Sequence, residues 1–197
     1  RQVVLEQPLR QESAWNYGAG LSYKFFLNFR EGMISVDYFR TDFTGQVVVD
    51  LEDARLLQIY NLQGKSFANA MQAEFTYEPF KRFETKLAYK FEFQRTDFKS
   101  GRKIYPLRPV HRGLLSLQYT TKNKAWRFNS SLNWFGKARV PDTSINDVAN
   151  QRSTRSKNWL QWNAQITFTR KSWEVYVGAE NMLNFIQQSP IIAGEQD

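Results

Sequence analysis

Alternation between apolar and polar side chains is the dominant pattern along the chain. In the segment 160–168 the even-numbered positions hold Leu, Trp, Ala, Ile and Phe, and the odd-numbered positions hold Gln, Asn, Gln and Thr. Successive side chains of a β-strand point to opposite faces of the sheet, so this segment predicts a strand with one apolar face and one uncharged polar face. The same alternation recurs in seven further segments: 15–25, 34–38, 71–77, 86–94, 115–120, 126–134 and 173–180. Helical periodicity is scarce, so the chain is predicted to be all-β with eight antiparallel strands.

The connections between these segments alternate between short and long. The short ones are 28–32, 79–82, 122–125 and 170–172, and they carry the charged residues, Gly and Pro of tight turns. The long ones are 51–64, 99–108 and 140–158. An up-and-down barrel with turns at one rim and loops at the other has this order, as do membrane barrels with short periplasmic turns and longer extracellular loops. The first twelve residues, 1–12, are predicted to form a polar loop.

Aromatic residues near both ends of the predicted strands favour a membrane barrel over a soluble one. Amphipathic rings prefer the headgroup level of a bilayer, so membrane barrels carry one aromatic girdle at each interface. One set flanks the short turns: Tyr23, Phe25, Tyr77, Phe83, Tyr119, Trp126, Phe168 and Trp173. A second set lies toward the long loops: Trp15, Tyr17, Phe91, Phe93, Trp134 and Trp159. A soluble β-barrel that binds a small apolar ligand is the less favoured interpretation, because the predicted polar faces hold mostly Gln, Asn, Ser, Thr and Gly rather than charges.

Composition excludes several other classes. The 197 residues include 31 aromatic side chains (16 Phe, 9 Tyr and 6 Trp), which excludes intrinsic disorder. The absence of Cys excludes a disulfide scaffold, an iron–sulfur protein and a zinc finger. The sequence also lacks the run of about 20 apolar residues that a membrane-spanning helix needs. The formal charge of +8 falls mainly in turns and loops.

Several motifs resemble those of TonB-dependent outer-membrane receptors, especially the Bacteroidetes-type ones. The most specific is the run Glu180-Asn181-Met182-Leu183-Asn184, which resembles the family's penultimate strand region. The opening Glu12-Ser13-Ala14-Trp15-Asn16-Tyr17-Gly18 resembles a strand opening of the same family. Further similar stretches lie at 35–43, 46–50, 73–79, 87–91, 108–112 and 162–167, so the resemblance covers essentially the whole chain.

The resemblance implies a transmembrane β-barrel of roughly 22 strands with an N-terminal plug. Residues 1–197 would then be the C-terminal part of that barrel, without the plug domain, the TonB box and the final strand. The implied function is active import of a scarce nutrient (a siderophore, cobalamin, a glycan or a peptide) across the bacterial outer membrane. The implied partners are outer-membrane lipid and lipopolysaccharide, the nutrient, the TonB complex through the absent plug, and a surface lipoprotein.

Candidate substrate contacts lie in the long loop 140–158, because binding residues concentrate on loops that a rigid scaffold holds in place. The polar and charged candidates are Asp142, Asn146, Asp147 and Arg152. A calcium-loop interpretation of this segment fails, since the required D-x-[DN]-x-[DN]-G spacing is absent. No metal site, no cofactor and no catalytic residue is predicted.

The densest basic stretch surrounds the loop 99–108. Lys99, Arg102 and Lys103 are candidates for contact with lipopolysaccharide phosphates on the outer face of a barrel. Nucleic-acid binding is disfavoured, because the neighbouring aromatic residues belong to predicted strands and not to the same exposed surface. His111, the only histidine, could in principle pair with Ser116 in a hydrolase site, but no G-x-S-x-G motif supports this and the chain is predicted not to be an enzyme.

Two membrane hypotheses therefore stand. The favoured one is a transporter of which this chain supplies barrel wall and extracellular loops. The alternative is a self-contained eight-stranded outer-membrane barrel with a structural or adhesive role, since eight strands can close alone.

Overall fold

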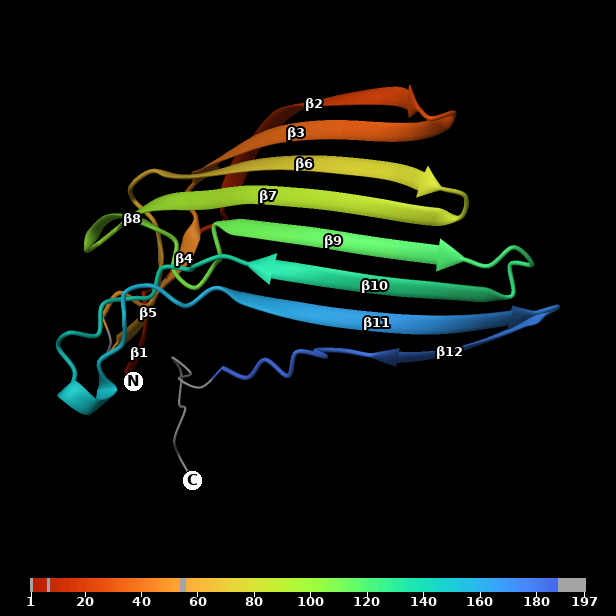
Figure 1. The fold of residues 1–197 in the computed structure, drawn as a ribbon. Coiled ribbons are helices and arrows are strands. Elements are labelled where there is room, and N and C mark those ends of the chain that lie inside the picture. The colour runs from red at the N-terminus through yellow and green to blue at the C-terminus, as the bar shows by residue number, and fades with distance from the viewer. Residues whose placement is uncertain (1, 7, 54–55, 188–197) are drawn as a thin grey trace.

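A large antiparallel sheet forms most of the structure, a computed structural model that describes residues 2–6, 8–53 and 56–187 (Figure 1). Eight of its nine strands follow one another across the sheet in chain order, and the ninth, a short strand, pairs with only one of them. The eight are β2 (Ser13–Leu27), β3 (Arg30–Thr44), β6 (Ser66–Phe80), β7 (Phe83–Phe98), β9 (His111–Thr120), β10 (Trp126–Phe135), β11 (Trp159–Arg170) and β12 (Trp173–Ala179). Each of the eight predicted segments lies in one of these strands, except that the last one extends one residue beyond β12, so the prediction of an all-β, up-and-down antiparallel fold is confirmed.

The sheet is curved but not closed within the described residues. β2 and β12 lie at its two edges, and each pairs with the main sheet on one side only. The four short turns gather at one end of the strands and the long connections at the other, as Figure 1 shows. The expected alternation of turns and loops is therefore present.

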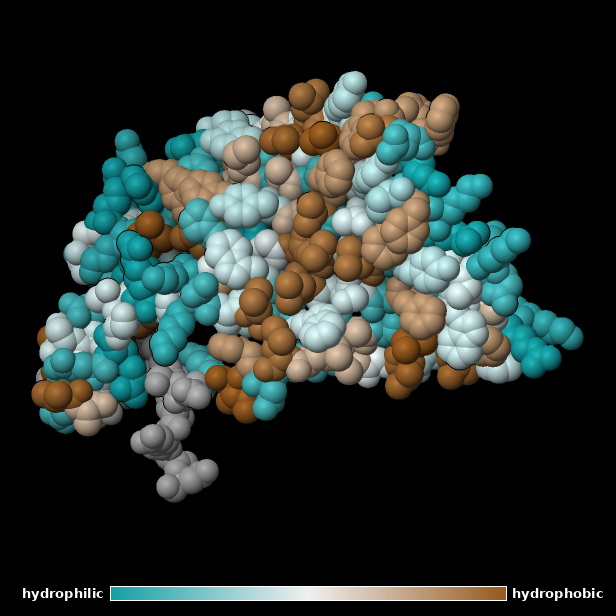
Figure 2. Space-filling model, in the orientation of Figure 1, coloured by the Kyte–Doolittle hydropathy of each residue, from teal (hydrophilic) through white to brown (hydrophobic). Residues whose placement is uncertain are grey.

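Pairing registers place the apolar side chains of all these strands on one face. Residues that pair directly across antiparallel strands lie on the same side of the sheet. One row runs without a break across seven strands: Tyr23, Ile34, Phe75, Leu87, Leu115, Leu132 and Trp162. Figure 2 shows hydrophobic residues over the middle of the strands and hydrophilic residues at both ends. The sheet thus has a continuous apolar face.

The opposite face is polar. Ser22, Ser35 and Glu74 pair in one row, and Asn129 pairs with both Gln118 and Gln165 in another. Some charged groups on this face have partners: Lys86 Nζ lies 2.7 Å from a Glu74 oxygen, and Gln72 Nε2 donates to Glu74 at 2.6 Å. Glu174 likewise pairs with Arg127 at 3.3 Å. The two ion pairs each join side chains of different strands, so these charges help to hold the strands together.

Both predicted aromatic belts are found, with one exception. The eight rings that flank the short turns all belong to the apolar face; Trp126 and Phe168, for example, have ring centroids 4.6 Å apart. In this belt Phe25 covers Gly32, where an added Cβ would lie 2.1 Å from the ring, so glycine makes room for the aromatic side chain. In the second belt Trp159 is the exception. It pairs with Phe135, whose register puts both on the polar face.

A second, three-stranded sheet forms at the long-loop end, and the sequence pattern did not predict it. Its order is β1 (Gln2–Leu5), β5 (Leu56–Asn61) and β4 (Val47–Asp50), and the β1–β5 pair is parallel. The prediction of loops at 1–12 and 51–64 was therefore wrong in part. The predicted loop 99–108 likewise contains β8 (Gly101–Ile104), which forms a hairpin with β7. Strands of four to six residues are too short to display an alternating pattern.

Helical structure among the described residues is limited to one 3₁₀ turn, η1 (Val148–Asn150). Accordingly, this part of the chain contains no helix that is long and apolar enough to cross a membrane.

Candidate functional site

The polar residues with the most partners gather at the long-loop end, around the three-stranded sheet. We call this region the cap, defined as residues 2–6, 46–53, 56–62, 99–110 and 136–158, which include β1, β4 and β5. Gln94, on the polar face of β7, donates from Nε2 to Gln46 Oε1 at 3.1 Å, just before β4 begins. The cap therefore contacts the polar face of the large sheet.

A small hydrophobic cluster holds the cap together. Val48, Tyr60 and Leu62 are all buried, and Val48 is fully so. Val48 and Tyr60 pair directly between β4 and β5. Since most large apolar side chains of the main sheet are exposed or half-buried, this cluster is a separate core that belongs to the cap.

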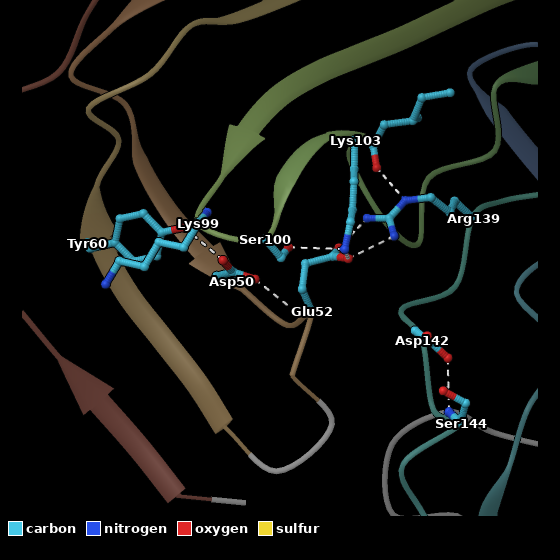
Figure 3. Close-up of polar contacts among 10 residues, drawn as sticks. Asp50, Glu52, Tyr60, Lys99, Ser100, Lys103, Arg139, Asp142 and Ser144 are labelled. Carbon is cyan, nitrogen blue, oxygen red and sulfur yellow. Dashed lines mark hydrogen bonds and ion pairs between the residues drawn. The ribbon is translucent and has the colours of Figure 1, made fainter.

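Glu52 joins three separate segments of the cap through ion pairs (Figure 3). Its side chain is only 4% exposed, and its carboxylate accepts a hydrogen bond from Lys103 Nζ at 2.9 Å and one from Arg139 Nη1 at 3.1 Å. Arg139 Nη2 donates to the other Glu52 oxygen, and Arg139 Nε donates to the Ile104 carbonyl at 2.5 Å. Lys103 belongs to β8 and Arg139 to the loop after β10, so one carboxylate connects the segment that follows β4 with β8 and that loop.

The two cations outweigh the effect of burial on Glu52. Burial by itself raises the pKa of the carboxyl group, but hydrogen bonds and charge from Arg139 and Lys103 bring the pKa below its ordinary value. The carboxylate is therefore charged at neutral pH. Removing it would leave two cations without their common partner.

Asp50 and Tyr60 form a second polar contact beside the cluster. Tyr60 Oη donates to Asp50 Oδ2 at 2.7 Å and accepts from the backbone N–H of Lys99 at 3.3 Å. Burial, together with the hydrogen bond to Asp50, raises the pKa of the Tyr60 hydroxyl. Lys99 Nζ lies 4.4 Å from the centre of the Tyr60 ring and pairs with Glu6. These contacts fix the β7–β8 hairpin against β5.

The four candidate substrate contacts lie in one loop, as predicted, and three of them support the loop's own structure. Asp142 Oδ1 accepts from the Ser144 backbone N–H at 2.9 Å, which lowers the pKa of Asp142. Asn146 N–H donates to the Thr143 carbonyl at 3.0 Å, and Arg152 Nη1 donates to the Ala149 carbonyl at 3.1 Å. Asp147 precedes η1, and its side chain makes no capping hydrogen bond. Their contact with substrate stays a prediction.

The three candidate lipopolysaccharide contacts do not share a face. Lys103 pairs in register with Thr96 on the polar face and reaches Glu52, while Lys99 is held by Glu6 and Tyr60. Arg102 pairs with Asp97 on the apolar side, where its Nε lies 2.5 Å from Asp97 Oδ1.

His111 lies on the apolar face beside aromatic residues. Its Nδ1 is 2.6 Å from Tyr89 Oη, and its ring centroid is 5.1 Å from that of Phe91. Ser116, the partner considered in the sequence, is on the polar face, where it pairs with Lys86 and Ser131. The two side chains therefore point to opposite sides of the sheet. Across the ranges that the structure describes, no group of three or more His, Asp or Glu side chains is placed to hold a metal ion.

Glu52 and Arg139 were missed in the sequence. Each lies in a segment without periodicity, and 87 positions separate them. The only hint is the Asp50-Leu51-Glu52 run, where carboxylates directly follow three valines. Such a run identifies a strand end but not a partner.

Comparison with known proteins shows which family this arrangement of strands resembles. The family model described as "TonB dependent receptor-like, beta-barrel" matches residues 3–182. No curated protein sequence matches the chain significantly.

Several solved structures share the fold at low sequence identity. FpvA from Pseudomonas aeruginosa bound to heterologous pyoverdines is 16% identical, with a TM-score of 0.61 over 90% of this chain and 24% of its own. A mutant of the ferric enterobactin receptor PfeA from the same organism is 11% identical, with a TM-score of 0.63 over 87% of this chain and 26% of its own. The FrpB iron transporter from Neisseria meningitidis is 12% identical, with a TM-score of 0.60 over 93% of this chain and 29% of its own. The chain thus spans less than a third of the length of these neighbours.

Proposed function

We propose that this chain, which belongs to the TonB-dependent receptor-like β-barrel family, forms part of the wall and mouth of an active importer in the bacterial outer membrane. The observation that carries the proposal is the sheet with two different faces. Its continuous apolar face, bordered by aromatic residues at both ends, suits contact with lipid, and its polar face suits a water-filled or plugged lumen. We propose no catalytic step for this protein.

The long-loop end would face the outside of the cell. Outer-membrane barrels have short turns on the periplasmic side and longer loops outside. In this orientation the cap lies at the extracellular mouth, on the lumen side of the wall. The loop with Asp142, Asn146, Asp147 and Arg152 would then be exposed to arriving nutrient.

Among the candidate nutrients we favour a ferric siderophore. The support comes from neighbours with the same fold: FpvA is bound to pyoverdines, PfeA is a ferric enterobactin receptor and FrpB is an iron transporter. Cobalamin, glycans and peptides remain the competing classes. The TonB complex would act through a plug domain outside these residues, and a surface lipoprotein would be a further partner.

Deletion of the complete gene tests the proposal. The deletion strain should grow more slowly than its parent only when iron is supplied as a siderophore complex, and complementation should require intact TonB. Impaired growth under cobalamin or glycan limitation instead would reassign the nutrient. Normal growth and uptake under all these limitations would contradict the importer itself.

The alternative, a self-contained eight-stranded barrel, gains no support from the sheet. In such a barrel β2 and β12 would pair with each other, whereas they lie at opposite edges of the described sheet.

A further inference from the structure

Basic and aromatic residues form a patch on the apolar face where β3, β6 and β7 approach the cap. We call it the Phe67 patch, made of Arg40, Phe67, Asn69, Phe93 and Arg95. Registers place all five on one face: Arg40 pairs with Asn69, which pairs with Phe93, and Phe67 pairs with Arg95. The patch is separate from the cap and from the lumen, because it faces the other side of the sheet.

The two guanidinium groups flank the aromatic rings. Arg40 Cζ lies 4.3 Å from the centre of the Phe67 ring, and Arg95 Cζ lies 5.6 Å from the centre of the Phe93 ring. Two strand spacings separate β3 from β7, so their backbones are about 10 Å apart. The extended side chains of Arg40 and Arg95 can therefore reach the same ligand group, which would lie between the two strands above Asn69.

Carboxylates neutralise only part of the charge. Arg40 Nη2 lies 2.8 Å from Asp42 Oδ1, and Tyr17 Oη also donates to Asp42, at 2.9 Å. Tyr38 Oη donates to Asn69 Oδ1 at 2.8 Å. Arg95 is exposed, and it forms no ion pair within residues 2–6, 8–53 and 56–187. The patch therefore offers guanidinium N–H donors that have no acceptor in this part of the chain.

The patch lies at the level where the hydrocarbon layer ends. Gly32 marks the short-turn aromatic belt, and from Gly32 to Asp42 strand β3 rises about 33 Å at about 3.3 Å per residue. With the strand tilt of about 35–45° found in outer-membrane barrels, this corresponds to about 25 Å along the membrane normal. The apolar band of such barrels is also about 25 Å tall. Asp42 shares its row with Phe67 and Arg95, so these residues would stand at the headgroups.

We infer that the Phe67 patch binds a phosphate group of an outer-leaflet lipid. Guanidinium groups bind phosphate through paired charge-assisted hydrogen bonds, and the adjacent rings would contact the first part of the acyl chains. A lipid is favoured over free phosphate because the donors adjoin the apolar face and not the lumen. The inference rests on the membrane location in the proposed function but is independent of the nutrient.

The test uses the full-length receptor, purified in detergent without nutrient. Binding of diphosphorylated lipid A is measured by native mass spectrometry for the wild type, for Arg95→Gln and for the double variant Arg40→Gln with Arg95→Gln. We expect Arg95→Gln to weaken binding about fivefold and the double variant to weaken it more than tenfold, because charge-assisted hydrogen bonds are lost. Arg170→Gln, on the same face at the short-turn end, is the matched control and should bind as the wild type does.

Two further arms identify the ligand. Dephosphorylated lipid A should bind the wild type as weakly as diphosphorylated lipid A binds the double variant, and millimolar inorganic phosphate should not displace the lipid. Equal binding by wild type and Arg95→Gln, or equal binding of both lipids, would overturn the inference. If the double variant does not fold, the Arg95→Gln result decides, since this change leaves no carboxylate of the described chain without its partner. Membrane fractionation tests the outer-membrane location separately. A result on nutrient uptake would concern the proposed import function and not the lipid site.

Discussion

At the residue scale, Glu52 is the side chain on which the cap depends most. Replacing it with Gln should destabilise the cap by roughly 3 kcal/mol, because a buried ion-pair partner is removed while one hydrogen-bond acceptor is kept. In the full-length receptor, tryptic cleavage within the cap should then be faster by about a hundredfold, since cleavage follows the population of the open form.

The matched control for this change is Glu84→Gln, an exposed carboxylate at the short-turn end. It should leave cap cleavage unchanged. Equal cleavage rates for Glu52→Gln and the wild type would show that Lys103 and Arg139 hold the cap without their common anion.

Acid should open the cap through the same residue. Because the pKa of Glu52 is lower in the folded cap than its ordinary value of 4.5, its contribution to stability is complete above about pH 4.5 and is lost as the pH falls through the folded pKa. Hydrogen exchange of the β4 and β5 amides, normalised to an unprotected peptide at each pH, should show protection that is constant from pH 7 to 5 and falls below pH 4.5. The Glu52→Gln variant should lack this step. A step of the same size in that variant would assign the acid response to another group.

At the element scale, the cap and the large sheet have separate cores. Val48 is fully buried in the cap, whereas its neighbour Val49 on the same strand is 39% exposed. Val48→Asp should therefore unfold the cap, since an unpaired charge would be buried, while Val49→Asp should not. The readouts are tryptic cleavage of the cap and the heat-modifiable gel mobility of the whole barrel in the full-length receptor. If Val48→Asp also abolished the heat-modifiable mobility, the two elements would fold as one unit.

The two elements also differ in how far the sequence predicts them. The strands of the large sheet have one lipid-type and one polar face, so their period of two is visible over ten or more residues, as in β11. β4 and β5 are short; β4 begins with three valines in a row, and the side chains of β5 are half-buried or buried on both faces, so neither sequence shows alternation. Glu52 could not be predicted as a hub either, because its role depends on Arg139, which only the tertiary structure brings near.

At the scale of the whole molecule, the unpaired edges of the sheet determine whether residues 1–197 can form a stable barrel alone. Eight strands are roughly a third of a 22-stranded barrel, and the described sheet has the open curvature of such an arc. In hydrocarbon every unpaired backbone N–H and C=O group costs several kcal/mol, so the free edges of β2 and β12 need further strands.

Residues 1–197 expressed alone and refolded in detergent should therefore show no heat-modifiable mobility, whereas the full-length receptor should show it. To close into a barrel by itself, the sheet would have to pair β2 with β12. It would then have to curve far more tightly than it does in this structure. The row of apolar side chains from Tyr23 to Trp162 would then lie on a strongly convex outer surface, and these side chains would spread apart. Heat-modifiable mobility of the isolated 197 residues would contradict this argument and favour the self-contained barrel, because only a sheet without edges resists unfolding in detergent in this way.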